Sequence, residues 1–227
     1  MSHKVVRLLF VCSLLFISVC SFAAAQRGTR SAPVDELAQL VQRVEMRYGR
    51  MRGLAADFEQ VYRAPGVRER RERGRLFLQR PGRMRWEYDP KPGKLFIVNG
   101  REVWFYSPAD REATLSDRTA VSDARFPFLF LLGQQNLGRV FRSIVFAEGA
   151  GDEGLRTLRL VPARAVEGLR EIYLTVRPNG EVVRLSFTGN AGESSEVTLS
   201  NVSENFIAPP SAFEFHPPPG VSVRRQK

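Results

Sequence analysis

Short runs in which every second residue is apolar recur along most of this chain, and no other feature constrains the fold as strongly. In the run Arg83–Tyr88, the residues Met84, Trp86 and Tyr88 are large and apolar, and charged residues stand between them. Successive side chains of a β-strand point to opposite faces. This run therefore predicts a strand with one apolar face that is buried, here called the dry face, and one charged face that is exposed to water. Repeated runs of this kind predict a curved antiparallel sheet.

Turn signals at Pro81-Gly82, Asn99-Gly100 and Asn179-Gly180 separate neighbouring runs tightly enough for hairpins. We therefore expect a mainly antiparallel meander of about eleven strands. The expected ranges are 53–63, 70–80, 83–88, 94–98, 102–107, 111–115, 143–148, 155–162, 169–177, 181–188 and 194–202. The proline-rich tail from Ala208 is expected to be extended and to lie at an edge of the sheet, because proline cannot join a central ladder.

A helix is expected before the strands, from Ser31 to Gly49. Pro33 suits the first turn, and Asp35 and Glu36 suit the positive end of the helix dipole. Apolar residues then follow at helical spacing, namely Leu37, Leu40, Val41 and Val44. The single apolar stripe predicts that this helix covers the dry face of the sheet.

The first 25 residues have the pattern of a secretory signal peptide. Lys4 and Arg7 precede an apolar run, and three alanines ending at Ala25 offer a cleavage site. Residues 26–227 are then expected to form a single mature domain. Both cysteines, Cys12 and Cys20, lie in this leader, so cleavage leaves no thiol for a disulfide, for zinc or for catalysis. The alternative, lipidation at Cys20, stays open, although a lipobox prefers a residue smaller than Val19.

The alternation breaks between Ser116 and Phe141. Seven consecutive apolar residues end at Gly133, namely Phe126, Pro127, Phe128, Leu129, Phe130, Leu131 and Leu132. A strand or a helix made of such a run has no polar face that could be exposed to water. We expect it to lie under or across the sheet, with the first helix at the open face.

Charge and composition argue against a nucleic-acid-binding function. The formal net charge is +10, but only four of the 34 basic residues are lysines, and no nucleic-acid motif accompanies them. The run Arg68–Arg75 mixes arginines with glutamates, which is typical of a solvated strand face with cross-strand ion pairs. We therefore expect no nucleic-acid partner.

Catalytic residues are scarce in the expected mature chain. His216 is its only histidine, which is too few for a metal site or a Ser-His-Asp arrangement. Glycines occur at turns and not as a phosphate loop. The sequence therefore predicts no enzyme, no cofactor and no metal.

In the run Arg75–Pro81 the alternation puts Arg80 on the same face as Leu76 and Leu78. If that face is the apolar one, the charge of Arg80 needs partners. A guanidinium has five donors and can hold several backbone carbonyls, so Arg80 is a candidate latch for a helix end or a loop. The alternative is that Arg80 ends a strand and reaches solvent beside Pro81.

The large side chains of the dry face are candidates for the wall of an apolar cavity. They are Leu40, Val44, Phe58, Leu76, Leu78, Met84, Trp86, Tyr88 and Trp104. The alternative is that the same side chains fill the core of a β-sandwich, which has no room for a ligand. Alternation specifies faces and not the volume between them, so both possibilities stay open.

Several blocks of this sequence, in this order, resemble the family of outer-membrane lipoprotein carriers named LolA. They are Leu54–Gln60, Gly74–Pro81, Met84–Tyr88, Asn99–Pro108, Phe126–Leu129 and Phe213–Val221. The resemblance implies an unclosed β-barrel with a helical lid over an apolar cavity. It implies a periplasmic, monomeric carrier that takes acylated lipoproteins from an inner-membrane ABC transporter towards the outer membrane, with or without a receptor there.

The resemblance also implies a role for particular residues. Arg80 would bond the lid backbone in the closed, empty state and release it when lipid enters, and Phe126–Leu132 with the first helix would form the lid. Two other classes stay open. One is a sensor or an outer-membrane receptor of the same fold, of which the receptor would need acylated Cys20. The other is a lipid esterase, which the missing nucleophile and base oppose.

Overall fold

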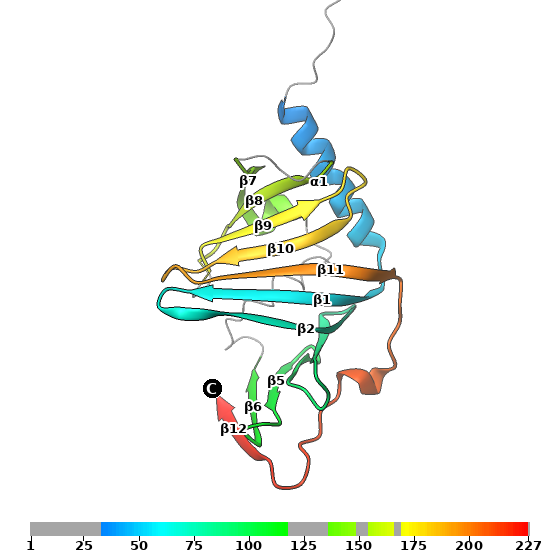
Figure 1. Ribbon diagram of the computed structural model, residues 1–227. Coiled ribbons are helices and arrows are strands. Elements are labelled where there is room, and N and C mark those ends of the chain that lie inside the picture. Colours follow the sequence, from blue (N-terminus) through cyan, green and yellow to red (C-terminus); the bar gives the residue numbers. More distant parts are fainter. Residues whose placement is uncertain (1–32, 118–135, 149–153, 166–168, 227) are drawn as a thin grey trace, which may run out of the picture.

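The computed structural model describes residues 33–117, 136–148, 154–165 and 169–226 of the 227-residue chain (Figure 1). The expected signal peptide and the expected lid run Phe126–Leu132 lie outside these residues. The helical elements are α1 (Pro33–Arg50), α3 (Leu137–Val140) and the 3-10 helix η1 (Pro210–Phe213). The strands are β1 (Gly53–Ala64), β2 (Val67–Gln79), β3 (Arg83–Tyr88), β4 (Leu95–Val98), β5 (Glu102–Ser107), β6 (Glu112–Asp117), β7 (Phe141–Phe146), β8 (Arg156–Pro162), β9 (Glu171–Val176), β10 (Val182–Thr188), β11 (Ser194–Glu204) and β12 (Ser222–Gln226).

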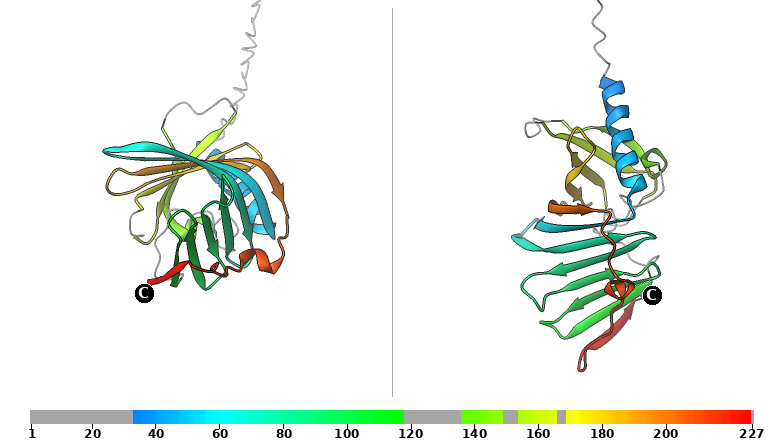
Figure 2. Two further views of the ribbon diagram at one scale, coloured as in Figure 1. Left: turned by 60° about the horizontal axis from the view of Figure 1, so that its bottom comes forward. Right: turned by 90° about the vertical axis from the view of Figure 1, so that its right-hand side faces the viewer.

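All of these strands join one curved sheet that does not close. The order is β12-β6-β5-β4-β3-β2-β1-β11-β10-β9-β8-β7, so β12 and β7 are its two edges (Figures 1 and 2). The long strands β1 and β2 lie near the middle, and β1 pairs with β11 on its other side. The expected fold class, mainly β with flanking helices and an unclosed sheet, is confirmed.

The C-terminal tail adds a strand that the sequence did not predict. β12 pairs with β6 in the parallel direction, whereas the neighbouring strands of the described sheet pair antiparallel. A parallel pair needs a long connection, and here the chain from Asn205 to Val221 crosses the outer face of the sheet before it returns beside β6 (Figure 2). The described part of the sheet therefore has twelve strands, one more than the eleven ranges expected from the sequence.

The alternation seen in the sequence matches the burial seen in the sheet. In β3 the residues Met84, Trp86 and Tyr88 are buried, and Arg83, Arg85 and Glu87 between them are half-buried. Arg85 lies on the outer face, where its Nη1 donates to the carbonyl oxygen of Ala212 at 2.9 Å. The C-terminal tail thus covers part of the outer face, and the inner face is left for α1.

Helix α1 lies on the concave side of the sheet (Figure 2). It begins at Pro33 and ends at Arg50, close to the expected limits, with Asp35 and Glu36 in its first turn. Leu40, Val44 and Tyr48 of α1 belong to the same buried cluster as the inner-face residues of the strands. None of the helices in the described ranges is long and apolar enough to cross a bilayer.

Candidate functional site

Eight of the nine residues expected to line an apolar cavity come together on the inner face. None of them is more than 3% exposed, and all belong to one buried cluster between α1 and the sheet. They are Leu40, Val44, Phe58, Leu76, Leu78, Met84, Trp86 and Tyr88. The sheet brings them together because β1, β2 and β3 are neighbours, with Leu76 opposite Trp86 and Leu78 opposite Met84 in the ladder.

Three aromatic rings of this inner face pack against one another. The ring centroid of Phe58 lies 4.5 Å from that of Trp86 and 5.1 Å from that of Tyr88, both in edge-on geometry. Edge-on pairs at this separation are favourable beyond their buried area. The Tyr88 hydroxyl donates to Oε1 of Gln60 at 3.1 Å, so its polar atom is satisfied at the border of the apolar surface.

Trp104 does not belong to this cluster, and its assignment to the cavity is corrected. The neighbours of Trp104 in β5, Val103 and Phe105, pack on the inner cluster, so Trp104 points to the outer face. There its ring lies 5.3 Å from the ring of Phe215 in the C-terminal tail. The run Val103–Tyr106 is apolar at every position, because one face packs on the core and the other on the tail.

Sequence reasoning also missed half of the inner face. Strands β8, β9 and β10 contribute buried residues of the same cluster, namely Leu158, Leu160, Ile172, Leu174, Leu185 and Phe187. Their alternation was visible in the sequence and identified the strands, but nothing in it showed that they face β1–β3 across one concave surface. The volume of the cavity stays a prediction, as does the lid at Phe126–Leu132.

Arg80 lies directly after β2 and contacts the C-terminal end of α1. Its Nη2 donates to the carbonyl oxygen of Tyr48 at 2.9 Å, and its backbone N–H donates to the carbonyl oxygen of Arg52 at 3.0 Å. The last carbonyls of a helix have no partner within the helix, so a guanidinium is well suited to bond them. The side chain is half-buried rather than extended into solvent.

Tyr48 is held from a second direction as well. Its hydroxyl oxygen accepts a hydrogen bond from the backbone N–H of Val182 at 2.9 Å, at the start of β10. Burial, only partly offset by this hydrogen bond, raises the pKa of Tyr48 to about 12. Tyr48 therefore joins the end of β2, through Arg80, to β10 on the other side of the sheet.

Two carboxylates fix α1 at further points. Glu204 accepts from Nε of Arg47 at 2.6 Å, which ties the last turns of α1 to the end of β11. Oε1 of Glu45 accepts from the backbone N–H of Leu137 at 2.6 Å, at the first turn of α3. Helix α1 is thus attached to both halves of the sheet by a small number of polar contacts over an apolar surface.

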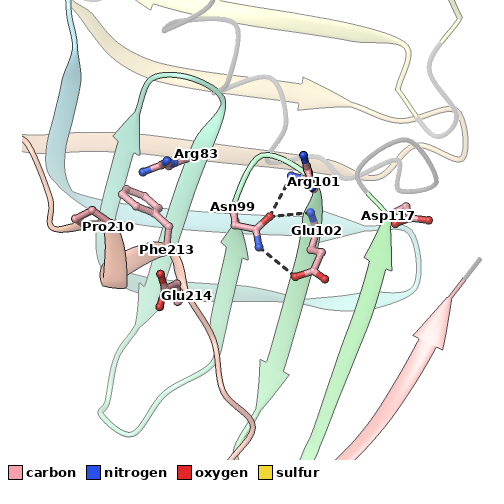
Figure 3. A pocket seen from close by; sticks show the side chains of 8 residues that line it. All are labelled: Arg83, Asn99, Arg101, Glu102, Asp117, Pro210, Phe213 and Glu214. Atoms are coloured by element: carbon pink, nitrogen blue, oxygen red, sulfur yellow. Dashed lines mark hydrogen bonds between the residues drawn. The ribbon is translucent and has the colours of Figure 1, made fainter.

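A separate groove of about 550 Å³ opens beside η1 at one end of β3–β6 (Figure 3). It is lined by Arg83, Asn99, Arg101, Glu102, Asp117, Pro210, Phe213 and Glu214. Asn99 stabilises the β4–β5 turn. Its Oδ1 accepts a hydrogen bond from the backbone N–H of Glu102 at 2.8 Å, and its Nδ2 donates one to Oε2 of Glu102 at 3.1 Å. This groove is polar and lies apart from the inner face, so it is not the candidate lipid site.

Comparison with known proteins identifies the group to which this fold and inner face belong. The family model described as outer membrane lipoprotein carrier protein LolA matches residues 50–216. The chain belongs to the LolA family. LolA-family relatives include the outer-membrane lipoprotein carrier protein of Methylococcus capsulatus, which is 30% identical over 177 residues, 78% of this chain and 83% of that protein. The protein of the same name from Chromobacterium violaceum is 28% identical over 88% of this chain and 94% of its own length.

Solved structures share the fold of this chain at low sequence identity. An uncharacterized conserved protein from Thermus thermophilus superimposes with a TM-score of 0.51 at 12% identity, covering 83% of this chain and 98% of that one. A DUF1329 family protein from Desulfovibrio piger gives a TM-score of 0.50 at 11% identity, covering 80% of this chain and 97% of that one. At these identities the likeness concerns the fold alone.

Proposed function

We propose that this chain is a periplasmic carrier that shelters the acyl chains of lipoproteins on the inner face of its sheet. It receives them from an inner-membrane ABC transporter and delivers them towards the outer membrane. The observation that carries the proposal is the apolar inner face of an unclosed sheet, which α1 covers through a few identifiable polar contacts. Family membership supports the same conclusion, since the relatives compared above are named lipoprotein carriers.

The physical need for such a carrier follows from the cargo. Each methylene removed from water is worth about 0.8 kcal/mol, so an acyl chain of about 15 methylenes represents roughly 12 kcal/mol. Lipoproteins with two or three such chains cannot cross an aqueous compartment unaided. The inner face offers leucine, methionine and aromatic side chains, which bury an acyl chain without bonding it in one position. Cargo can then leave when an acceptor binds it more tightly.

Arg80 adjusts how tightly the cargo is held. Lipid that enters between α1 and the sheet has to displace part of α1, and the hydrogen bond from Arg80 to the Tyr48 carbonyl opposes this movement. A hydrogen bond to a charged group contributes about 1.5–3 kcal/mol. The binding energy of the cargo is reduced by this amount, which favours transfer to the next protein.

The carrier is proposed to perform no covalent chemistry. His216 is 91% exposed in its side chain, so it is surrounded by solvent and not enclosed in a pocket. In the part of the chain that the structure describes, no three His, Cys, Asp or Glu side chains are placed to hold a metal ion. We expect purified protein to leave ester and amide bonds of its cargo intact, which lipid analysis after long incubation tests.

Photo-crosslinking from matched positions tests the carrier function. A photoreactive phenylalanine analogue at Phe58 lies on the inner face, and the same analogue at Trp104 lies on the outer face. After purification from the periplasm, we expect acylated lipoprotein to crosslink to position 58 and not to position 104. Absence of any acylated species by mass spectrometry, or equal crosslinking from both positions, would contradict the proposal.

A further inference from the structure

The turn end of the β1–β2 hairpin carries a surface that the carrier function does not use. We call residues 62–73 the arginine hairpin. β3 pairs with β2 only from Gly74 to Gln79, so the segment Val67–Glu72 has β1 as its ladder partner and an open edge on its other side. The arginine hairpin therefore projects past β3–β6 at one rim of the sheet (Figures 1 and 2).

Positive charge in this hairpin exceeds the available carboxylates. The sequence places five arginines and two glutamates between residues 62 and 73, a net charge of +3. Both glutamates are already paired, because Glu69 accepts from Arg63 at 2.7 Å and from Arg71 at 2.8 Å, and Glu72 pairs with Lys94.

Three arginines keep their charge uncompensated by a carboxylate. Arg68, Arg70 and Arg73 are exposed and form no ion pair with any residue that the structure describes. Glu59 stands opposite Arg73 in the ladder, but its carboxylate pairs with Arg71 at 3.5 Å. The hairpin thus offers free guanidinium groups to an anionic partner.

The arginines are distributed around the hairpin rather than along one face. Arg70 stacks over the ring of Tyr62 at 5.0 Å on one face of the ladder, and the alternation puts Arg71 and Arg73 on the other. The tip between them, Ala64–Val67, is uncharged, and Val67 is 56% exposed. A flat anionic surface that meets the tip end-on reaches Arg68 and Arg70 on one face and Arg63 on the other, whereas Arg73, six residues from Val67, lies about 20 Å further back along the strand.

We propose that the arginine hairpin binds the anionic phospholipid headgroups of a membrane surface, tip first. Guanidinium groups pair with phosphate oxygens in bidentate fashion, and a small apolar tip can enter the boundary between headgroups and acyl chains. An acidic patch on a folded protein would face one side of the hairpin and leave the arginines of the other side unused. The inference does not depend on Arg80, on the lid or on the cargo.

Vesicle flotation tests the proposal on the full mature chain. Vesicles of phosphatidylcholine with phosphatidylglycerol are compared with vesicles of phosphatidylcholine alone, at low and high ionic strength. The test variant is Arg68→Gln with Arg70→Gln, which removes the two arginines near the tip that have no ion pair. The matched control, Arg50→Gln with Arg225→Gln, removes the same charge from two exposed arginines, one at the end of α1 and one in β12.

We expect binding to anionic vesicles only, weaker at high salt, because exposed charges are screened. Each arginine near an anionic surface contributes about fivefold, so the hairpin variant should bind about 25-fold more weakly and the control should change little. A Val67→Trp variant should gain a blue-shifted emission component on anionic vesicles, relative to the parent, which supports contact at the tip.

Three results would overturn the proposal. The first is equal binding to neutral and anionic vesicles. The second is equal weakening in the hairpin variant and the control variant, which would show that net charge alone is responsible. The third is binding to polyglutamate that depends on Arg68 and Arg70 while vesicles are not bound, which would assign the surface to an acidic protein. Circular dichroism of each variant verifies that the sheet is retained.

Discussion

Replacement of Arg80 by leucine removes the proposed latch, the guanidinium hydrogen bond, and leaves the backbone contacts of the fold in place. The guanidinium bonds the Tyr48 carbonyl at 2.9 Å, whereas the bond that closes the β2–β3 turn onto Arg52 comes from the backbone N–H of residue 80. Leucine keeps that backbone bond and continues the apolar row of Leu76 and Leu78. We therefore expect Arg80→Leu to fold and to retain cargo more strongly than the parent.

The magnitude follows from the hydrogen bond that is removed. A bond from a charged donor contributes about 1.5–3 kcal/mol, and a half-buried guanidinium belongs at the lower end of this range. A change of about 1.4 kcal/mol is a factor of ten in an equilibrium constant. Arg80→Leu should thus bind an acylated lipopeptide about tenfold more tightly and pass it to acceptor vesicles correspondingly more slowly.

The assay measures dissociation of a fluorescent acylated lipopeptide and its transfer to acceptor vesicles. Arg83→Leu is the matched control, because Arg83 lies on the same turn but lines the outer groove and not the inner face. Transfer by Arg80→Leu at the rate of the parent protein would refute the latch. So would an equal delay in Arg83→Leu, because the effect would then come from the turn itself.

Three further predictions concern the inner face and its anchor. Tyr48→Phe removes the acceptor for the Val182 N–H, so the free energy of unfolding should fall by about 1–3 kcal/mol, measured by urea denaturation; an unchanged midpoint would contradict this anchoring role. Because the folded pKa of Tyr48, about 12, exceeds its ordinary value of 10.0, the stabilisation is complete below pH 10 and is lost as the pH rises from 10 to 12, by roughly 3 kcal/mol in all. Denaturation curves in that window should show this slope in the parent and a smaller slope in Tyr48→Phe. Trp86→Ala leaves a gap in the inner cluster and should cost about 3–5 kcal/mol, while Trp104→Ala on the outer face should cost less; the reverse order in thermal unfolding would mean that the two faces are assigned wrongly.

The sequence alone determined the kind of fold and the faces of most strands. Alternation is local, so Met84, Trp86 and Tyr88 had to share a face in any sheet that contains them. The same rule put Arg80 in line with Leu76 and Leu78, and helical spacing gave α1 within two residues of its observed limits. These features depend on neighbours in the chain and on the geometry of one strand or one helix.

Only the tertiary structure decided which surfaces meet. Trp104 stands in a run that is apolar on both faces, and its outward direction was settled by Phe215, more than 100 residues later in the chain. β12 became a parallel partner of β6 because the tail crosses the outer face, and Arg80 found the Tyr48 carbonyl because α1 ends beside the β2–β3 turn. Alternation states that a face is dry, but not which distant segment covers it, since that choice depends on contacts between residues far apart in the sequence.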